Sequence, residues 1–105
     1  MYLRVGEDQN GRCAWWLHDD SDTVIAWSGG PCDSTEEAHQ AATEFRESAA
    51  DARYEVYEDI GETWRWRAWR MGHRIATSSE TFEGLVEAEQ AARAVRSGAG
   101  AAVGP

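Results

Sequence analysis

The sequence predicts an α+β protein that is built from two copies of one unit, each with three strands followed by a helix. At an offset of 50 residues the second half of the chain matches the first, so that Trp16 falls on Trp66. One residue fewer in the first turn of the second copy also brings Val5 onto Val56. Strand-like runs and an Ala-rich helical stripe recur in both halves, as expected for a supersecondary unit that is too small to bury a core alone.

We expect these two copies to share one core within a single domain that spans residues 1–105. The first repeat covers residues 2–49 and the second covers residues 54–97. Residues 98–105 are rich in Gly and Ala, which predicts a flexible tail.

Each copy begins with three short runs in which aromatic and β-branched residues are frequent, a composition that favours strands. Asn10 and Gly11 lie between the first two runs and predict a tight hairpin turn. The six predicted strands span 2–7, 12–18, 23–28, 54–59, 63–69 and 73–78.

An Ala-rich helix follows the third strand of each copy. In the first copy Ser34 and Glu37 form a capping-box pattern, and small or apolar residues then recur at helical spacing as far as Phe45. In the second copy a similar stripe ends at Val95, but Gly84 stands where the capping Ser is expected. We therefore expect the second helix to begin without a side-chain cap.

The second copy carries a set of aromatic, Arg, Gly and Ser positions at fixed spacing, namely 54–59, Gly61, Trp64, Arg65, Trp66, Arg67, Gly72, Ile75, Ala76, Ser78, Glu80 and Phe82. Through these residues it resembles the YegP-like family of small tandem-repeat proteins of unknown function. The resemblance implies one six-stranded antiparallel sheet with two helices on one face, and it implies no activity. It also implies a further strand after the last helix, which the Gly- and Ala-rich tail is not expected to form.

The chain is strongly acidic, with 19 acidic and 10 basic residues and a net charge of −9. Every basic residue is Arg, a composition that fits a halophilic host with a GC-rich genome. This charge argues against sequence-independent binding to nucleic acid, which needs attraction to phosphate. The chain has no long apolar run and no signal-peptide pattern, so we expect no membrane association and a cytoplasmic location.

Side chains alternate across a strand, so the repeat also predicts which residues face the helices. We expect Trp16 and Trp66 to lie in the core beneath the helices. The opposite face of the first copy would then expose Trp15, Leu17 and Val24, an apolar patch that should not be left in water. These three residues predict a surface that binds a protein partner, which can be a second copy of the chain in a homodimer.

The second strand of the second copy offers an alternative function, because it alternates Arg with Trp. Such a face can stack on bases and contact phosphates. We favour the simpler interpretation, in which these arginines pair with Glu55 and Asp59 across the sheet. The residues of the nucleic-acid alternative are Arg65, Arg67, Trp69, Arg70 and Arg74.

The sequence predicts no catalytic, cofactor-binding or metal-binding site, and we expect the protein not to be an enzyme. His18, His39 and His73 are scattered without metal-ligand spacing. The acidic segment 19–22 lacks the Gly and the distal Glu of a calcium-binding loop.

Two cysteines, Cys13 and Cys32, fall where the second copy has Thr63 and Phe82 at an offset of 50. Their spacing matches no redox or metal motif. We expect two reduced, half-buried thiols, the usual state of cysteines in a cytosolic protein.

Overall fold

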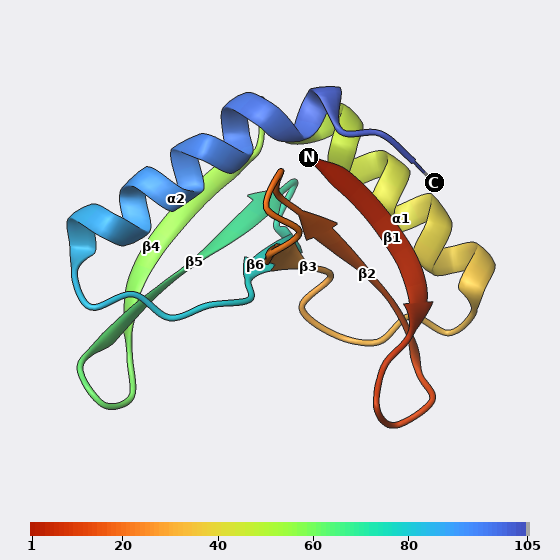
Figure 1. The fold of residues 1–105 in the computed structure, drawn as a ribbon, viewed down its shortest axis with the longest axis horizontal. Helices are drawn as coiled ribbons and strands as arrows, with labels where there is room; N and C mark the ends of the chain where they lie inside the picture. The colour runs from red at the N-terminus through yellow and green to blue at the C-terminus, as the bar shows by residue number, and fades with distance from the viewer. Residues whose placement is uncertain (105) are drawn as a thin grey trace.

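The computed structural model describes residues 1–104 and contains one six-stranded antiparallel sheet with two long helices on one face, as predicted (Figure 1). The strand order is β1-β2-β3-β6-β5-β4. The strand boundaries lie within one residue of those predicted. The elements are β1 (Tyr2–Glu7), β2 (Cys13–His18), β3 (Val24–Trp27), α1 (Thr35–Ser48), β4 (Arg53–Asp59), β5 (Thr63–Arg70), β6 (His73–Ser78), α2 (Leu85–Gly98) and the 3-10 helix η1 (Ala99–Ala101).

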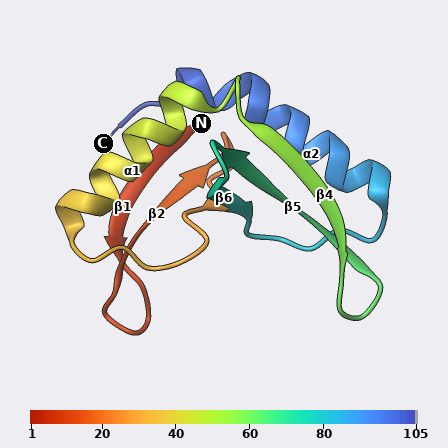
Figure 2. The ribbon, with the colours of Figure 1, turned by 180° about the vertical axis from the view of Figure 1, so that it is seen from behind.

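The two halves of the sheet meet where β3 pairs with β6. Trp27 lies directly opposite Thr77 in this pairing, and the two residues are 50 positions apart in the chain. Each half therefore contributes three adjacent strands on its own side of this central pair. The sheet bends into an arch with α1 and α2 along its outer side, and no helix covers the underside (Figures 1 and 2).

The beginnings of the two helices differ as the sequence predicts. At the first helix the Ser34 side chain accepts a hydrogen bond of 3.1 Å from the backbone N–H of Glu37. The Glu37 carboxylate accepts from the backbone N–H of Asp33, one residue before the cap. The second helix begins after Gly84 without a side-chain cap, which costs only about a few tenths of a kcal/mol because Gly is itself tolerated at this position.

The strand register corrects the predicted alignment of the two copies. Val5 pairs with Trp15 in the first half, and Val56 pairs with Trp66 in the second half. The residues of β1 and β2 therefore both match residues of the second half at an offset of 51. The sequence predicted the change from 51 to 50 in the first turn, between these two strands. The extra residue of the first copy lies in the turn between β2 and β3, where Asp22 has a φ of 65°.

This shift of one residue reverses the two faces of β2, because neighbouring side chains point to opposite faces of a sheet. Trp66 is buried, as predicted. Trp15 and Leu17 are also buried, with 1% and 0% exposure, whereas Trp16 lies half-buried on the helix-free face. The prediction that Trp15 and Leu17 form an exposed partner-binding surface is therefore wrong.

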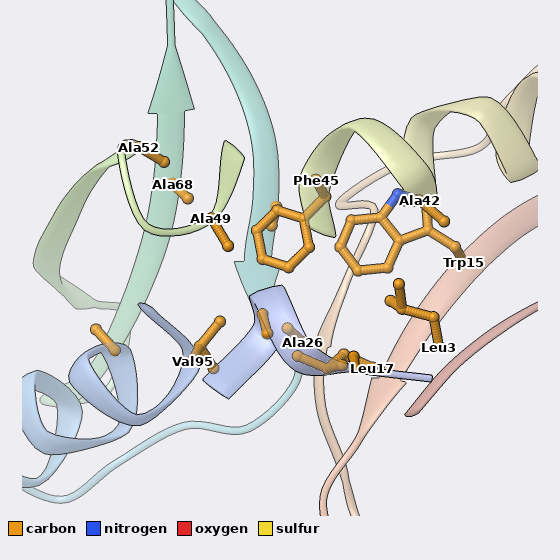
Figure 3. Close-up of a cluster of buried hydrophobic side chains, with 14 of the residues drawn as sticks. Leu3, Trp15, Leu17, Ala26, Ala42, Phe45, Ala49, Ala52, Ala68 and Val95 are labelled. Atoms are coloured by element: carbon orange, nitrogen blue, oxygen red, sulfur yellow. The ribbon is translucent and has the colours of Figure 1, made fainter. Parts of the chain in front are cut away.

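The core lies between the sheet and the two helices. The Trp15 ring stacks on Phe45 of α1 at a centroid distance of 4.9 Å, with Leu3 beside it (Figure 3). Alanines line the inner face of each helix and let it approach the sheet closely. Ile25 and Ile75 also pack against this core, as predicted for the helix-facing side of β3 and β6.

The C-terminal segment is ordered through Gly104, so the prediction of a flexible tail over residues 98–105 is wrong for 98–104. Ala99 and Ala102 are buried in the core. Val103 forms a parallel bridge with Tyr2 at the outer edge of β1. This single bridge stands where the family resemblance implied a further strand. The last residue lies outside the described part of the chain.

Candidate binding site on the helix-free face

The helix-free face carries a continuous row of directly paired residues that crosses all six strands. Each member lies opposite the next in the strand register, so their side chains share one face. The row has two tryptophans near its centre and a charged residue at each end. In spatial order it consists of Arg4, Trp16, Trp27, Thr77, Arg67 and Glu55.

In the second half of the face, two arginines are paired with acids. The Arg67 guanidinium forms an ion pair with Glu55 and lies 4.4 Å from the centroid of the Tyr57 ring. Arg65 Nε lies 2.8 Å from Asp59 Oδ2. For Arg65 and Arg67 the favoured interpretation of the sequence, in which the arginines pair with acids across the sheet, is confirmed; within residues 1–104, Arg70 and Arg74 form no ion pair.

Glu55 is the centre of this network. Its Oε1 atom also accepts a hydrogen bond of 3.1 Å from the indole N–H of Trp69. The hydrogen bonds from Arg67 and Trp69 stabilise the ionised carboxylate and hold the pKa of Glu55 below its usual value.

The first half of the face is organised around Arg4, which is exposed. Its guanidinium lies 4.3 Å from the centroid of the Trp16 ring, and its Nε donates to His18 Nε2 at 3.3 Å. The His18 ring in turn stacks on Tyr2 with centroids 4.4 Å apart. The Tyr2 hydroxyl is hydrogen-bonded to Asp22, which raises the pKa of Tyr2. Within residues 1–104, Arg4 forms no ion pair with a carboxylate.

An open hollow of about 600 Å³ lies on this face. Trp16, Trp27 and Val24 line it together with the two flanking arginines, Arg4 and Arg65. The hollow therefore joins residues of both halves of the chain, which neither repeat would place together alone.

The residues of the two predicted sites lie in different parts of the structure. Arg65, Arg67 and Trp69 lie on the helix-free face, and Val24 lines the hollow. Arg70 is the last residue of β5 and lines a pocket with Glu44 and Glu47 of α1, and Arg74 donates a hydrogen bond of 2.8 Å to the Gly29 carbonyl. The five residues of the nucleic-acid alternative therefore do not form one surface.

Sequence reasoning missed Arg4, Trp16 and Trp27 as members of this face. For Trp16 the missing signal was the length of the second turn, which is one residue longer in the first copy. Placing the extra residue in the second turn would have put Trp16 on the face that points away from the helices, beside Arg4. Trp27 was missed because the register shifts in the pairing of β2 with β3, as it does in the pairing of β5 with β6.

No set of three or more His, Cys, Asp or Glu side chains within residues 1–104 is arranged to hold a metal ion. In the same described part of the chain, no helix is both long enough and apolar enough to cross a membrane.

Comparison with known proteins identifies the fold. No protein-family model matches the chain, and no curated protein matches it. Two solution NMR structures are similar. The protein of unknown function yegP from E. coli has 15% identity and a TM-score of 0.77, over 93% of this chain and 84% of that protein. A UPF0339 protein from Shewanella oneidensis has 13% identity and a TM-score of 0.79, over 94% of this chain and 84% of that protein. These similarities confirm the fold that the family resemblance implied.

Proposed function

We propose that this protein is a non-catalytic interaction module and that its helix-free face binds a short acidic segment of another protein. The half-exposed Trp16 and Trp27 at the centre of the six-strand row are the observation that carries the proposal. Trp, Tyr and Arg are the residue types that dominate the binding energy of protein interfaces, and this face combines all three.

The charge of the face supports an acidic partner. The strand residues on this face include four arginines, Arg4, Arg53, Arg65 and Arg67, and two carboxylates, Glu55 and Asp59. Asp8 of the first turn also lines the hollow and adds a third carboxylate, so the arginines still outnumber the acids. The whole chain, in contrast, has a net charge of −9. Arg4 is exposed, lies against Trp16 and has no carboxylate partner within residues 1–104. It is therefore free to pair with an acid of the bound segment.

Nucleic acid fits the same face less well. Arg65 and Arg67 are already neutralised by Asp59 and Glu55, so a phosphate would have to displace these carboxylates. The acidic remainder of the molecule would also repel a polyanion over distances of about 10 Å at moderate salt.

Self-association through this face is also less favourable. The underside of the arch is concave, and two concave faces cannot pack closely against each other (Figures 1 and 2). A short extended segment, in contrast, can lie within the arch between its two hairpins.

Selection from a random peptide library on immobilised protein tests this proposal. We expect the selected peptides to be rich in Asp and Glu around an apolar residue. Their affinity should fall at least about tenfold with Trp16→Ala or Arg4→Ala, as expected for a residue at the centre of an interface. Arg93→Ala, on the exposed side of α2, is the matched control and should leave the affinity unchanged.

The same variants are then titrated with a fluorescent deoxythymidine oligonucleotide. Binding that weakens steeply with salt and is lost in Arg4→Ala would identify nucleic acid as the partner and overturn the proposal. Selected peptides that bind all three variants equally would exclude the helix-free face as the binding site. Circular dichroism of each variant confirms that it is folded.

A further inference from the structure

Cys13 and Cys32 lie directly opposite each other, although 18 residues separate them in the chain. Cys13 is the first residue of β2, and Cys32 lies in the loop that leads to α1. The two form an isolated antiparallel bridge, in which the backbone N–H of Cys32 donates to the carbonyl of Cys13 at 2.8 Å. In the second half of the chain, the corresponding bridge joins Trp64 to Phe82.

The geometry of such a bridge is compatible with a disulfide. Opposed residues in a hydrogen-bonded antiparallel pair have Cα atoms about 5.5 Å apart. Disulfides connect Cα atoms at roughly 4.4 to 6.8 Å, and opposed side chains point to the same face of a sheet. Both thiols are free in the structure and both are only partly buried, so a small oxidant can reach them.

We propose that Cys13 and Cys32 form a reversible disulfide within one chain by exchange with a low-molecular-weight disulfide. A thiolate of the protein attacks one sulfur of the small disulfide and releases the first small thiol. The second cysteine then attacks the mixed disulfide and releases the second small thiol. The two protein thiols are oxidised, the small disulfide is reduced, and the two thiol protons pass to the released thiols.

The surroundings of Cys32 indicate which cysteine attacks first. Burial raises the pKa of the Cys32 thiol, and Glu37 of α1, the Cys13 sulfur and Asp33 raise it further. Arg74 and Glu44 line the same shallow pocket from β6 and α1. A raised pKa lowers the fraction of Cys32 that is thiolate and so disfavours it as the first attacking sulfur.

The disulfide would connect the start of β2 to the segment just before the helix cap at Ser34. It would close a loop of about 20 residues, which stabilises a protein mainly by restricting its unfolded chain. Because the chain is small, we expect the melting temperature to rise by on the order of 10 °C on oxidation. Oxidation would then fix the connection between the sheet and α1.

Incubation of the full chain with oxidised glutathione, followed by alkylation and intact-mass measurement, tests the proposal. We expect the wild type to become a monomer that has lost two hydrogens, carries no glutathione and accepts no alkyl group. Cys13→Ser and Cys32→Ser each replace one sulfur by oxygen. In each variant the remaining cysteine should either form a mixed disulfide with glutathione or stay a free thiol, because no second thiol can complete the exchange. The rise in melting temperature should occur only in the oxidised wild type and should reverse with dithiothreitol.

Three results would overturn the proposal. The first is a wild type that keeps bound glutathione even at mildly alkaline pH, where both thiols react. The second is a dimer linked between chains on a non-reducing gel. The third is an intramolecular disulfide that leaves the melting temperature unchanged or lowers it, since the bridge would then distort the native pairing.

Discussion

Trp15 of β2 and Trp66 of β5 occupy equivalent positions in the two halves of the sheet. Each lies opposite a valine of the preceding strand, Val5 or Val56, and each is buried beneath a helix. Their neighbours on the helix-free face differ in kind. Trp16 follows Trp15, and Arg67 follows Trp66, so the same position is aromatic in one half and cationic in the other. The core is thus symmetric while the candidate binding face is not.

The stability of single-residue variants should follow this register. Trp15→Ala and Trp66→Ala should each cost about 3–5 kcal/mol, because each leaves a large cavity in the core. Trp16→Ala should cost less than about 1.5 kcal/mol, since its ring is only partly buried and lies outside the main core. Urea denaturation measures all three. A larger loss for Trp16→Ala than for Trp15→Ala would contradict the register.

Leu17→Arg should prevent folding and not merely separate a dimer. Leu17 has 0% exposure and packs in the main core, where an unpaired charge has no partner. Val24→Arg is the matched control, because Val24 lines the open hollow and should accept a charge. Circular dichroism and sedimentation decide the outcome. A folded, monomeric Leu17→Arg variant would restore the surface that the sequence first predicted.

The Glu55 network should make stability depend on pH. Because its folded-state pKa is lowered, Glu55 stabilises the native protein above the pKa of its unfolded form, about 4.3. This contribution is lost as the pH falls through the lower, folded-state pKa. Glu55→Gln should therefore destabilise the protein at pH 7, and the difference from wild type should vanish in acid.

Glu58→Gln is the control for this experiment, since Glu58 is an exposed residue on the same strand. Denaturation of both variants at neutral and acidic pH gives the comparison. Equal effects of the two substitutions would show that total charge, and not the Glu55 hydrogen bonds, controls the response.

The C-terminal segment should contribute to stability despite its Gly- and Ala-rich composition. The Arg46 side chain donates hydrogen bonds to the carbonyls of Ala102 and Gly104, and Leu3 donates its backbone N–H to Val103 at 2.9 Å. Truncation after Gly98 removes these contacts and uncovers Leu3. We expect a lower melting temperature than that of the full chain. An unchanged value would mean that the segment does not hold this position in solution.

Added KCl should raise the melting temperature. Because the net charge is −9, the excess acidic groups repel one another in the folded state, and salt screens this repulsion. Salt also weakens surface ion pairs such as Arg65 with Asp59, but each is worth only about 0–1 kcal/mol. Screening of the net charge should therefore dominate. A flat or falling curve between low and molar KCl would remove the halophilic interpretation.

Most of the fold could be predicted from the sequence because its signals are local. The Ser34 cap lies beside the helix that it begins, and the Asn10-Gly11 turn lies between the strands that it joins. The number and order of the elements follow from such short-range chemistry. Trp66 was placed correctly because the strand that contains it alternates clearly between faces.

The position of the extra residue could not be settled by the same local signals. Trp15 and Trp16 are adjacent and identical in type, so composition could not decide which of them matches Trp66. A shift of one residue exchanges the two faces of a strand. Only the pairing of β2 with β1 and the packing of β2 against α1 select one register. The error in the predicted partner surface follows from this single choice.

The sequence by itself determined the six strands, the two helices, the acidic charge and the pairing of arginines with Glu55 and Asp59. These depend on residues that are close in the chain or that repeat at a regular spacing. Tertiary structure decided which tryptophan is buried, how the tail packs and which distant side chains meet. Trp27 meets Thr77 and Cys13 meets Cys32 only because β3 pairs with β6 and the loop before α1 returns to β2. Contacts of this kind depend on long-range register, and no local propensity specifies them.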